Sequence, residues 1–228
     1  MHRYNKLQQG IWKIGEHPHK LIPVPIASES LLEEQIIADI SLLNTGWMII
    51  GHQVRIAFDK YIDLLAIGAS GSVIIIELKQ NKTARFVVTQ ALDYASWVVN
   101  IDDRKLVDIF FDFSKKRPLK EQSFNIAFKL KFGISFDDVN YDVSHQMVIV
   151  AAEIDESSER IINYLNNTAK KPINVVFFTV FEDGGNQYLS RAWMIPPEET
   201  QERSISKSSK GPWNGEFYVS FDHGKHRH

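Results

Sequence analysis

Runs of apolar residues divide the first half of the chain into predicted strands and helices. Residues 47–58, 62–67 and 73–79 are short runs rich in Ile, Leu and Val, which is typical of β-strands. The last two runs are joined by a Gly-Ala-Ser-Gly turn and barely alternate with polar residues. Because strands that are apolar on both faces lie in the middle of a sheet, we expect these two to form a central hairpin.

Two segments carry the periodicity of helices. In residues 30–43 most apolar side chains fall on one helix face, and Ser30 followed by Glu33 matches a capping box that starts the helix there. Residues 83–100 are apolar around much of their surface, which predicts a largely buried helix. Helices therefore precede and follow the three predicted strands.

The second half of the chain continues this alternation. Residues 145–154 and 173–183 are predicted as strands, and residues 155–171 between them as an amphipathic helix. A Gly-Gly-Asn turn then leads to a predicted hairpin partner at residues 187–195, whereas residues 102–133 are less regular and only partly helical. This order indicates an α/β domain with a central mixed β-sheet flanked by helices.

Changes in composition divide the chain into four parts. Residues 1–26 form an N-terminal arm, and residues 27–196 carry the α/β pattern. Residues 197–211 are polar and rich in Ser and Lys, which predicts a flexible linker. Residues 212–228 begin like a strand and then stop. Since a lone strand cannot bury itself, this segment either pairs with the preceding domain or starts a truncated C-terminal module.

Composition excludes several classes of protein. The chain has 228 residues, 44% hydrophobic and 24% charged, as in soluble globular proteins. Cysteine is absent, which excludes disulfides and thiolate metal sites and favours a cytoplasmic location. We expect neither a membrane span, which needs roughly 18–20 apolar residues, nor a signal peptide. With a net charge of −2, affinity for nucleic acid must come from a local patch.

Three ionisable residues interrupt the predicted apolar hairpin. Glu77 and Lys79 are two positions apart on one strand, so their side chains point to the same face. If the turn places Ala66 opposite Ile74, Asp63 lies opposite Glu77 and the three groups form one cluster. A register slip of one residue would put Asp63 on the other face of the sheet.

The chemistry of this cluster favours a divalent metal. Two neighbouring carboxylates beside an apolar core are costly unless a cation or a proton compensates. Lys79 neutralises one charge, and Mg²⁺ or Mn²⁺ suits the remaining oxygen ligands. Such a site suits hydrolysis of a phosphodiester bond by metal-activated water. The alternative is a surface ion pair of Glu77 and Lys79 with Asp63 near a turn, the common explanation for an isolated Glu-x-Lys.

These residues also carry a resemblance to a known family. Asp63, followed fourteen residues later by Glu-Leu-Lys, resembles the signature of the PD-(D/E)xK nuclease superfamily, with Ile62 in place of its proline. Gln90 and Tyr94 resemble the Q-x-x-x-Y extension of the RecB-like branch and of related structure-specific and mismatch endonucleases. The resemblance covers residues 27–196 and implies a restriction-endonuclease-like core with the order α-β-β-β-α-β.

The resemblance implies roles for the cluster. In such enzymes Asp63, Glu77 and the backbone carbonyl of Leu78 would bind the metal. Lys79 would position or activate the attacking water.

Two helices would complete the site in such enzymes. On the first helix we favour Glu33 at the edge of the metal, with Glu29 and Glu34 as rivals and the capping box as a structural alternative for Glu33. Gln90 and Tyr94 lie one turn apart on one helix face, so both would reach the site or the nucleic-acid backbone. Their structural alternative is a buried helix face, with Tyr94 in the core.

Basic residues near the predicted site are candidates for contact with phosphates. Lys82 and Arg85 lie just beyond the motif strand, and Lys115, Lys116 and Arg117 lie in a later basic run. A solvated surface is the alternative for this run, and for the phenylalanines interleaved with it we favour a core.

The sequence thus predicts a metal-dependent endonuclease that hydrolyses DNA phosphodiester bonds. DNA as the partner, including branched or mismatched DNA, is implied by the resemblance alone. Cutting two strands needs two sites or two events, which makes a homodimer plausible. The alternatives are a non-cleaving nucleic-acid-binding or scaffold module of the same fold, and an α/β interaction domain with no nucleic-acid role. Retention of Asp63, Glu77 and Lys79 argues against the non-cleaving module.

Overall fold

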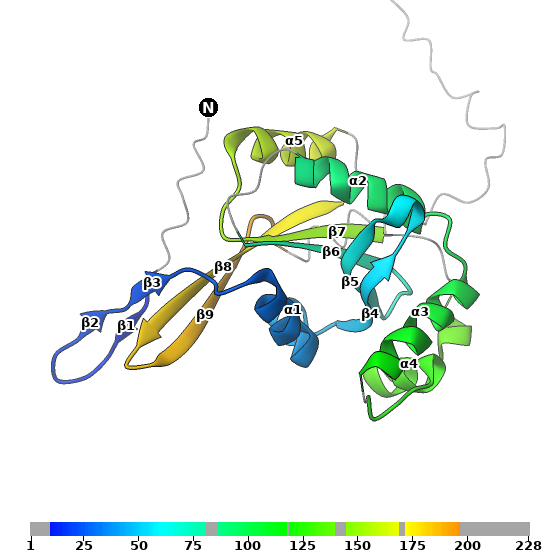
Figure 1. Cartoon of the computed structure of the whole chain (residues 1–228), viewed down its shortest axis with the longest axis horizontal. Helices are drawn as coiled ribbons and strands as arrows, with labels where there is room; N and C mark the ends of the chain where they lie inside the picture. The colour runs from blue at the N-terminus through cyan, green and yellow to red at the C-terminus, as the bar shows by residue number, and fades with distance from the viewer. Residues whose placement is uncertain (1–9, 81–85, 118, 140–144, 169–171, 197–228) are drawn as a thin grey trace, which may run out of the picture.

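A mixed β-sheet runs through the centre of the molecule (Figure 1). The computed structural model describes residues 10–80, 86–117, 119–139, 145–168 and 172–196. Within them the sheet contains seven strands: β3 (Ile22–Val24), β4 (Trp47–Arg55), β5 (Tyr61–Gly68), β6 (Val73–Lys79), β7 (His145–Ala151), β8 (Ile173–Asp183) and β9 (Asn186–Trp193). A separate small hairpin is formed by β1 (Trp12–Lys13) and β2 (His19–Lys20).

Parallel and antiparallel pairs are combined in this sheet. The strands β4, β5 and β6 follow one another as an antiparallel meander, and β6, β7 and β8 are parallel. Both β3 and β9 pair antiparallel with β8. The two central parallel connections contain helices, as crossovers between parallel strands require.

Helices cover both faces of the sheet. They are α1 (Glu29–Ala38), α2 (Phe86–Val98), α3 (Asp103–Lys116), α4 (Phe124–Phe132) and α5 (Glu156–Asn167), with short 3₁₀ turns at Ile40–Leu42, Ala57–Asp59 and Phe136–Asp138. In Figure 1, α2 and α5 lie over one face and α1 lies on the opposite side, while α3 packs against β4. The predicted fold class, a central mixed sheet flanked by helices, is confirmed. None of the described helices combines the length and the apolar character that a membrane crossing needs.

The hairpin of β5 and β6 has the register that the sequence predicts. Ala66 pairs with Ile74, and the turn between the strands contains Gly71 at a φ of 80°, which glycine adopts without strain. Every residue of β6 except Lys79 is buried. The apolar runs therefore do form the centre of the sheet.

The start of α1 differs from the predicted capping box. Ser28 has the extended backbone of an N-cap, and its hydroxyl accepts a hydrogen bond of 3.0 Å from the backbone N–H of Leu31. Ser30 already lies inside the first turn, so the predicted pairing of Ser30 with Glu33 is wrong. The helix also ends at Ala38, because a separate 3₁₀ turn follows. As a consequence, Glu33 has no capping role and is available for other contacts.

Residues 102–133 are more regular than predicted. Asp102 caps α3 by accepting a hydrogen bond of 2.8 Å from the backbone N–H of Lys105, and α4 ends at Gly133 in a left-handed conformation. Phe113, Phe124 and Phe128 are buried, which confirms a core role for these phenylalanines. The rings of Phe110 on α3 and Phe124 on α4 pack edge to face, while α3 lies against β4.

Parts of the predicted organisation lie outside the described residues. The predicted linker 197–211 and the segment 212–228 belong to this group. The arm is described from residue 10, where it contributes β1, β2 and β3, and β3 pairs with the distal end of β8.

Gly51 allows β4 and α3 to approach closely. A Cβ atom at this position would lie 2.5 Å from Cγ2 of Val54 and 2.8 Å from Cγ2 of Ile109. Both neighbours are β-branched and stiff at χ1, so they cannot easily turn away. The site described below depends on this part of β4.

We expect Gly51→Ala to destabilise the protein by about 1–3 kcal/mol, because the added methyl overpacks the contact between β4 and α3. The measurement is urea unfolding of the two proteins. Gly15→Ala is the control, since a Cβ at Gly15 meets nothing within 4 Å. Equal losses of unfolding free energy in Gly51→Ala and Gly15→Ala would contradict the packing argument.

Candidate active site

Glu77 lies at the end of β6 with its carboxylate buried. Its exposed fraction is 1%, and Oε1 accepts a hydrogen bond of 2.6 Å from Nζ of Lys79. Oε2 is also buried and has no hydrogen-bond partner among the described residues. Desolvation and, next, the charge of Asp63 raise the pKa of Glu77 to about 8, although Lys79 opposes both effects. The site thus contains a carboxylate that lacks a compensating group on one side.

Asp63 on β5 lies beside the end of β6. Its Oδ2 accepts a hydrogen bond of 2.8 Å from the backbone N–H of Leu78, and its Oδ1 accepts one of 3.3 Å from Nε2 of Gln53. A strand residue directs its N–H and C=O to the same neighbour, so the Leu78 carbonyl also faces the Asp63 side. The structure therefore brings together Asp63, Glu77 and Lys79, as the hairpin register requires.

Lys79 lies at the border between the buried carboxylates and solvent. Its side chain is 22% exposed. Burial alone would lower the pKa of Lys79, but the hydrogen bond and charge of Glu77, with Asp63 and Glu29, outweigh it and raise that pKa. Lys79 is therefore a protonated ammonium group at neutral pH.

Glu33 on α1 is the first-helix acid that is connected to this cluster. It is 8% exposed, its Oε2 lies 2.7 Å from Nε2 of His52, and both carboxylate oxygens accept from Gln53 at 3.3 and 3.4 Å. Since Gln53 also contacts Asp63, a single amide joins the two acids. Because Nδ1 of His52 lies 3.3 Å from the guanidinium of Arg117, which can only donate, the Nε2–H of His52 is the one that faces Glu33.

The two rival glutamates have hydrogen-bond partners outside the cluster, although the charge of Glu29 also acts on Lys79. Oε1 of Glu29 accepts a hydrogen bond of 2.8 Å from the backbone N–H of Gln80. Glu34 forms a bidentate ion pair with Arg117 at the outer side of α1. The geometry thus favours Glu33 among the three candidates.

Gln90 and Tyr94 share one face of α2 and contact each other. Nε2 of Gln90 donates to the hydroxyl of Tyr94 at 2.6 Å, and Tyr94 is 2% exposed. Burial raises the pKa of Tyr94; the hydrogen bond from Gln90 and the charge of Lys79 oppose this, whereas Glu77 and Asp63 add to it. The Tyr94 hydroxyl therefore lies within electrostatic reach of the cluster, and its ring is part of the core.

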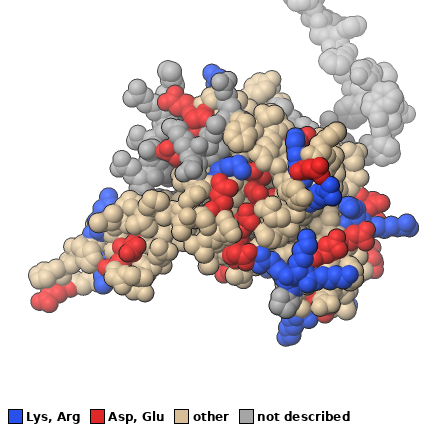
Figure 2. Space-filling model, in the orientation of Figure 1, with Lys and Arg blue, Asp and Glu red and all other residues tan. Residues whose placement is uncertain are grey.

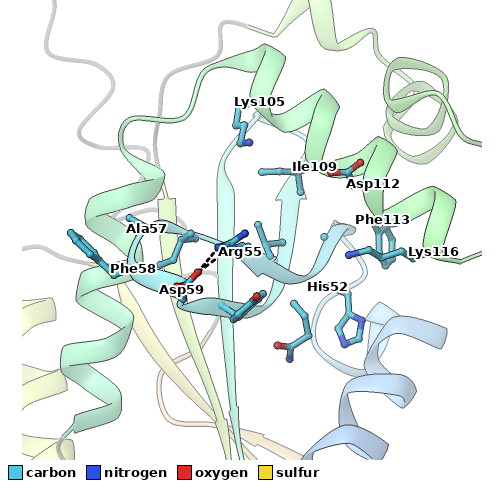
Figure 3. A pocket seen from close by; sticks show the side chains of 15 residues that line it. His52, Arg55, Ala57, Phe58, Asp59, Lys105, Ile109, Asp112, Phe113 and Lys116 are labelled. Atoms are coloured by element: carbon cyan, nitrogen blue, oxygen red, sulfur yellow. Dashed lines mark hydrogen bonds and ion pairs between the residues drawn. The ribbon is translucent and has the colours of Figure 1, made fainter.

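A groove lies on the α3 side of β4, and His52 and Gln53 are the residues of the site that line it. It has a volume of about 690 Å³ and runs between residues 51–59 and α3, where Lys105 and Lys116 line it (Figure 3). Figure 2 shows Asp and Glu side chains in the middle of this face and Lys and Arg side chains next to them, in the region of α3 and α4. Asp63, Glu77 and Lys79 do not line the groove, and Asp59 and Asp112 line it together with the two lysines.

The five predicted phosphate contacts have different surroundings. Lys116 lines the groove, and Lys115 lies 3.9 Å above the ring of Phe111. The guanidinium of Arg117 is held by Glu34. Lys82 and Arg85 lie outside the described residues.

Two residues of the site were missed by the sequence reasoning. His52 and Gln53 lie on β4 and hold Glu33, but neither belongs to a motif. The sequence signal was weak: a polar pair interrupting an otherwise apolar strand. The register shift between Ile49 and Gly51 and the φ of 48° at Gln53, which direct these side chains, are not visible in the sequence.

The cluster fits a hard divalent cation. Among the described residues no three His, Asp or Glu side chains converge to form a metal site by themselves. Mg²⁺ commonly uses one or two carboxylates together with water and substrate oxygens, and Asp63, Glu77 and the Leu78 carbonyl provide such a set. The unpartnered Oε2 of Glu77 and the raised pKa of Glu77 are what a bound cation would relieve.

Comparison with known proteins gives distant similarities only. No family model matches the chain, and no curated protein matches it in sequence. A repair endonuclease from Pyrococcus abyssi is similar at 15% identity and a TM-score of 0.38, over 67% of this chain and 47% of that one. EndoMS in a complex with double-stranded DNA follows at 12% identity and a TM-score of 0.36, over 71% and 67% of the two chains. EndoMS in its apo form has 11% identity and a TM-score of 0.35, over 68% and 60%.

The chain spans about half the length of the Pyrococcus endonuclease. At this level of similarity we draw the chemistry of the site from the residues of this chain alone.

We expect the metal-free protein to lose stability between pH 5 and pH 8.5. The folded pKa of Glu77 lies above its unfolded value, so its contribution is present below about pH 4.5 and is lost as the pH rises through about 8. Thermal unfolding should show a fall of roughly 5 °C or more, given about 2–4 °C per kcal/mol for a domain of this size.

Glu77→Gln is the control for this titration, because it keeps the shape of the side chain and removes the charge. Its unfolding midpoint should depend less on pH over this range. A variant and wild type with identical pH profiles would show that Glu77 does not titrate as the structure indicates.

Proposed function

We propose that this protein is a metal-dependent endonuclease that hydrolyses DNA phosphodiester bonds. The observation that carries the proposal is the buried carboxylate of Glu77 next to that of Asp63, with Lys79 bonded to one of the Glu77 oxygens. A stable surface ion pair would not leave an ionisable oxygen buried in this way, since such an atom costs free energy unless something binds it. Sites of catalysis are where such perturbed groups gather.

In this proposal Asp63, Glu77 and the backbone carbonyl of Leu78 hold Mg²⁺ or Mn²⁺. A divalent metal at such a site lowers the pKa of a water molecule and polarises the phosphate. The backbone N–H of Leu78 fixes one oxygen of Asp63. Lys79 fixes one oxygen of Glu77. The chain thereby orients both carboxylates.

Lys79 stabilises negative charge in this mechanism. In the metal-free protein the carboxylates raise the pKa of Lys79, which favours its ammonium form. Its ammonium group can orient the attacking water and stabilise the charge that builds up on the phosphate oxygens. Of the two roles considered from the sequence, we therefore propose the electrostatic one.

Glu33, Gln90 and Tyr94 act around the metal ligands in this proposal. Glu33 lies at the edge of the site and can accept a hydrogen bond from a bound water. The hydroxyl of Tyr94, polarised by Gln90, can donate a hydrogen bond toward the carboxylates or the substrate backbone.

The choice of DNA rests on the motif resemblance, supported by the cations near the cluster. Lys115 and Lys116 at the end of α3 are the described residues that we assign to backbone contact. Branched or mismatched DNA as a preferred substrate, a homodimer and a cytoplasmic location remain predictions from the sequence.

Plasmid nicking with Mg²⁺ or Mn²⁺ tests the proposed activity. We expect Lys79→Ala to lower the cleavage rate by about 10²–10³, since it removes a charge that stabilises the transition state. Lys13→Ala is the matched control, because Lys13 also forms an ion pair, at 2.8 Å with Asp183, but in the arm. The control should cleave at the wild-type rate.

Absence of cleavage by folded wild type in both metals would contradict the endonuclease. If wild type then still binds DNA, the non-cleaving binding module is the better description. If wild type neither binds nor cleaves DNA, the interaction domain without a nucleic-acid role is favoured.

Lys116→Ala should weaken DNA binding, because it lowers the electrostatic contribution to the binding free energy. Because each phosphate contact releases counterions, the slope of log K against log salt should fall by about 1. The measurement is a salt titration of DNA affinity by fluorescence anisotropy. Lys20→Ala, on the arm, is the control and should leave the slope unchanged. A Lys116→Ala variant with the wild-type slope would show that Lys116 does not contact DNA.

A further inference from the structure

Gln53 occupies a strained position in β4. Its φ is 48°, a left-handed conformation that residues other than glycine seldom adopt. The β4 residues on either side of Gln53 pair with the β5 residues on either side of Asp63, so Gln53 stands opposite Asp63. Strained residues persist where the surrounding structure holds them, and they gather at functional sites.

The Gln53 amide lies between two carboxylates from different elements. Its Nε2 is 3.3 Å from Oδ1 of Asp63 on β5, and 3.3 and 3.4 Å from the two carboxylate oxygens of Glu33 on α1. An NH₂ group has two hydrogens, so it can donate one to each acid. The reverse orientation of the amide would place its oxygen against two anions, which excludes it.

The charge of the site explains why a neutral donor is suitable here. Asp63, Glu77 and Glu33, when ionised, carry three negative charges, and Lys79 carries one positive charge. Two negative charges remain, which a divalent cation would neutralise. A lysine or arginine in place of Gln53 would reduce this charge and compete with the cation, whereas an amide holds both acids without changing it.

We infer that Gln53 is a positioning residue for the divalent cation, which sets the separation and orientation of Asp63 and Glu33 and holds a strained backbone to do so. This inference rests on the proposed metal-dependent function. His52 supports Glu33 from its other side, with a contact of 2.7 Å. Partners that orient metal ligands commonly change metal affinity about 10–100-fold when they are replaced.

Two substitutions of Gln53 distinguish the effect of losing the amide from the effect of relieving the backbone strain. Gln53→Met keeps the size and the left-handed backbone but removes both donors. Gln53→Gly removes the donors and also the strain. We expect both variants to bind Mn²⁺ about 10–100-fold more weakly in calorimetric titrations, while metal-free Gln53→Gly unfolds roughly 2–4 °C above metal-free Gln53→Met.

Phe58→Gly is the matched control. Phe58 has a φ of 59°, lies five residues further along the chain, and is 93% exposed. Replacing it relieves the same kind of strain in the same region without touching Asp63 or Glu33. Its Mn²⁺ affinity should equal that of wild type.

The outcomes are distinguishable. Mn²⁺ affinities within twofold of wild type in both Gln53 variants would overturn the inference while leaving the proposed function intact. A loss in Phe58→Gly as large as that in Gln53→Gly would also overturn it, because the loop rather than the amide would then be responsible. No binding of Mn²⁺ by wild type would overturn the proposed function and this inference with it.

Discussion

The carboxylate of Glu77 is held away from water because β6 runs between β5 and β7 in the middle of the sheet. Its neighbours along the strand are aliphatic and buried, so the backbone cannot expose the acid without breaking the central hairpin. Lys79 and Asp63 both interact with this buried carboxylate. Lys79 pairs with it, and Asp63 raises the pKa of Glu77. A carboxylate in such a place is stable only as an acid, as an ion pair, or as a ligand.

The parts of the site that lie on the hairpin could be predicted from the sequence. Strand alternation is a local property, and a short glycine-containing turn leaves few registers between two apolar strands. Placing Ala66 opposite Ile74 was enough to bring Asp63 beside the end of β6. Gln90 and Tyr94 could also be placed on one helix face, because their spacing of four residues fixes it.

The parts that join distant elements could not be predicted. Ser28 and Ser30 both lie near the start of the first helix, and the choice of Ser28 as the cap depends on the path of the arm, which is a tertiary property. The contact of His52 and Gln53 with Glu33 depends on a register shift and on a left-handed residue inside a strand. Such irregularities carry no periodic signal. Similarly, Phe124 of α4 packs against Phe110 of α3 and against Phe136 beyond α4, and these tertiary contacts cannot be derived from the periodicity of either helix.

The pairing of both β3 and β7 with β8 has a consequence for folding during synthesis. β7 pairs with the first half of β8, and β3 pairs with its distal end. The first strand of the sheet in chain order therefore pairs with one of the last. During synthesis from the N-terminus, β3 leaves the ribosome long before its partner exists and is then a bare strand that another nascent chain could join. Pro23 lies in the middle of β3 and has no N–H to donate. The proline makes the waiting strand a poor template for aggregation, at little cost to the finished edge.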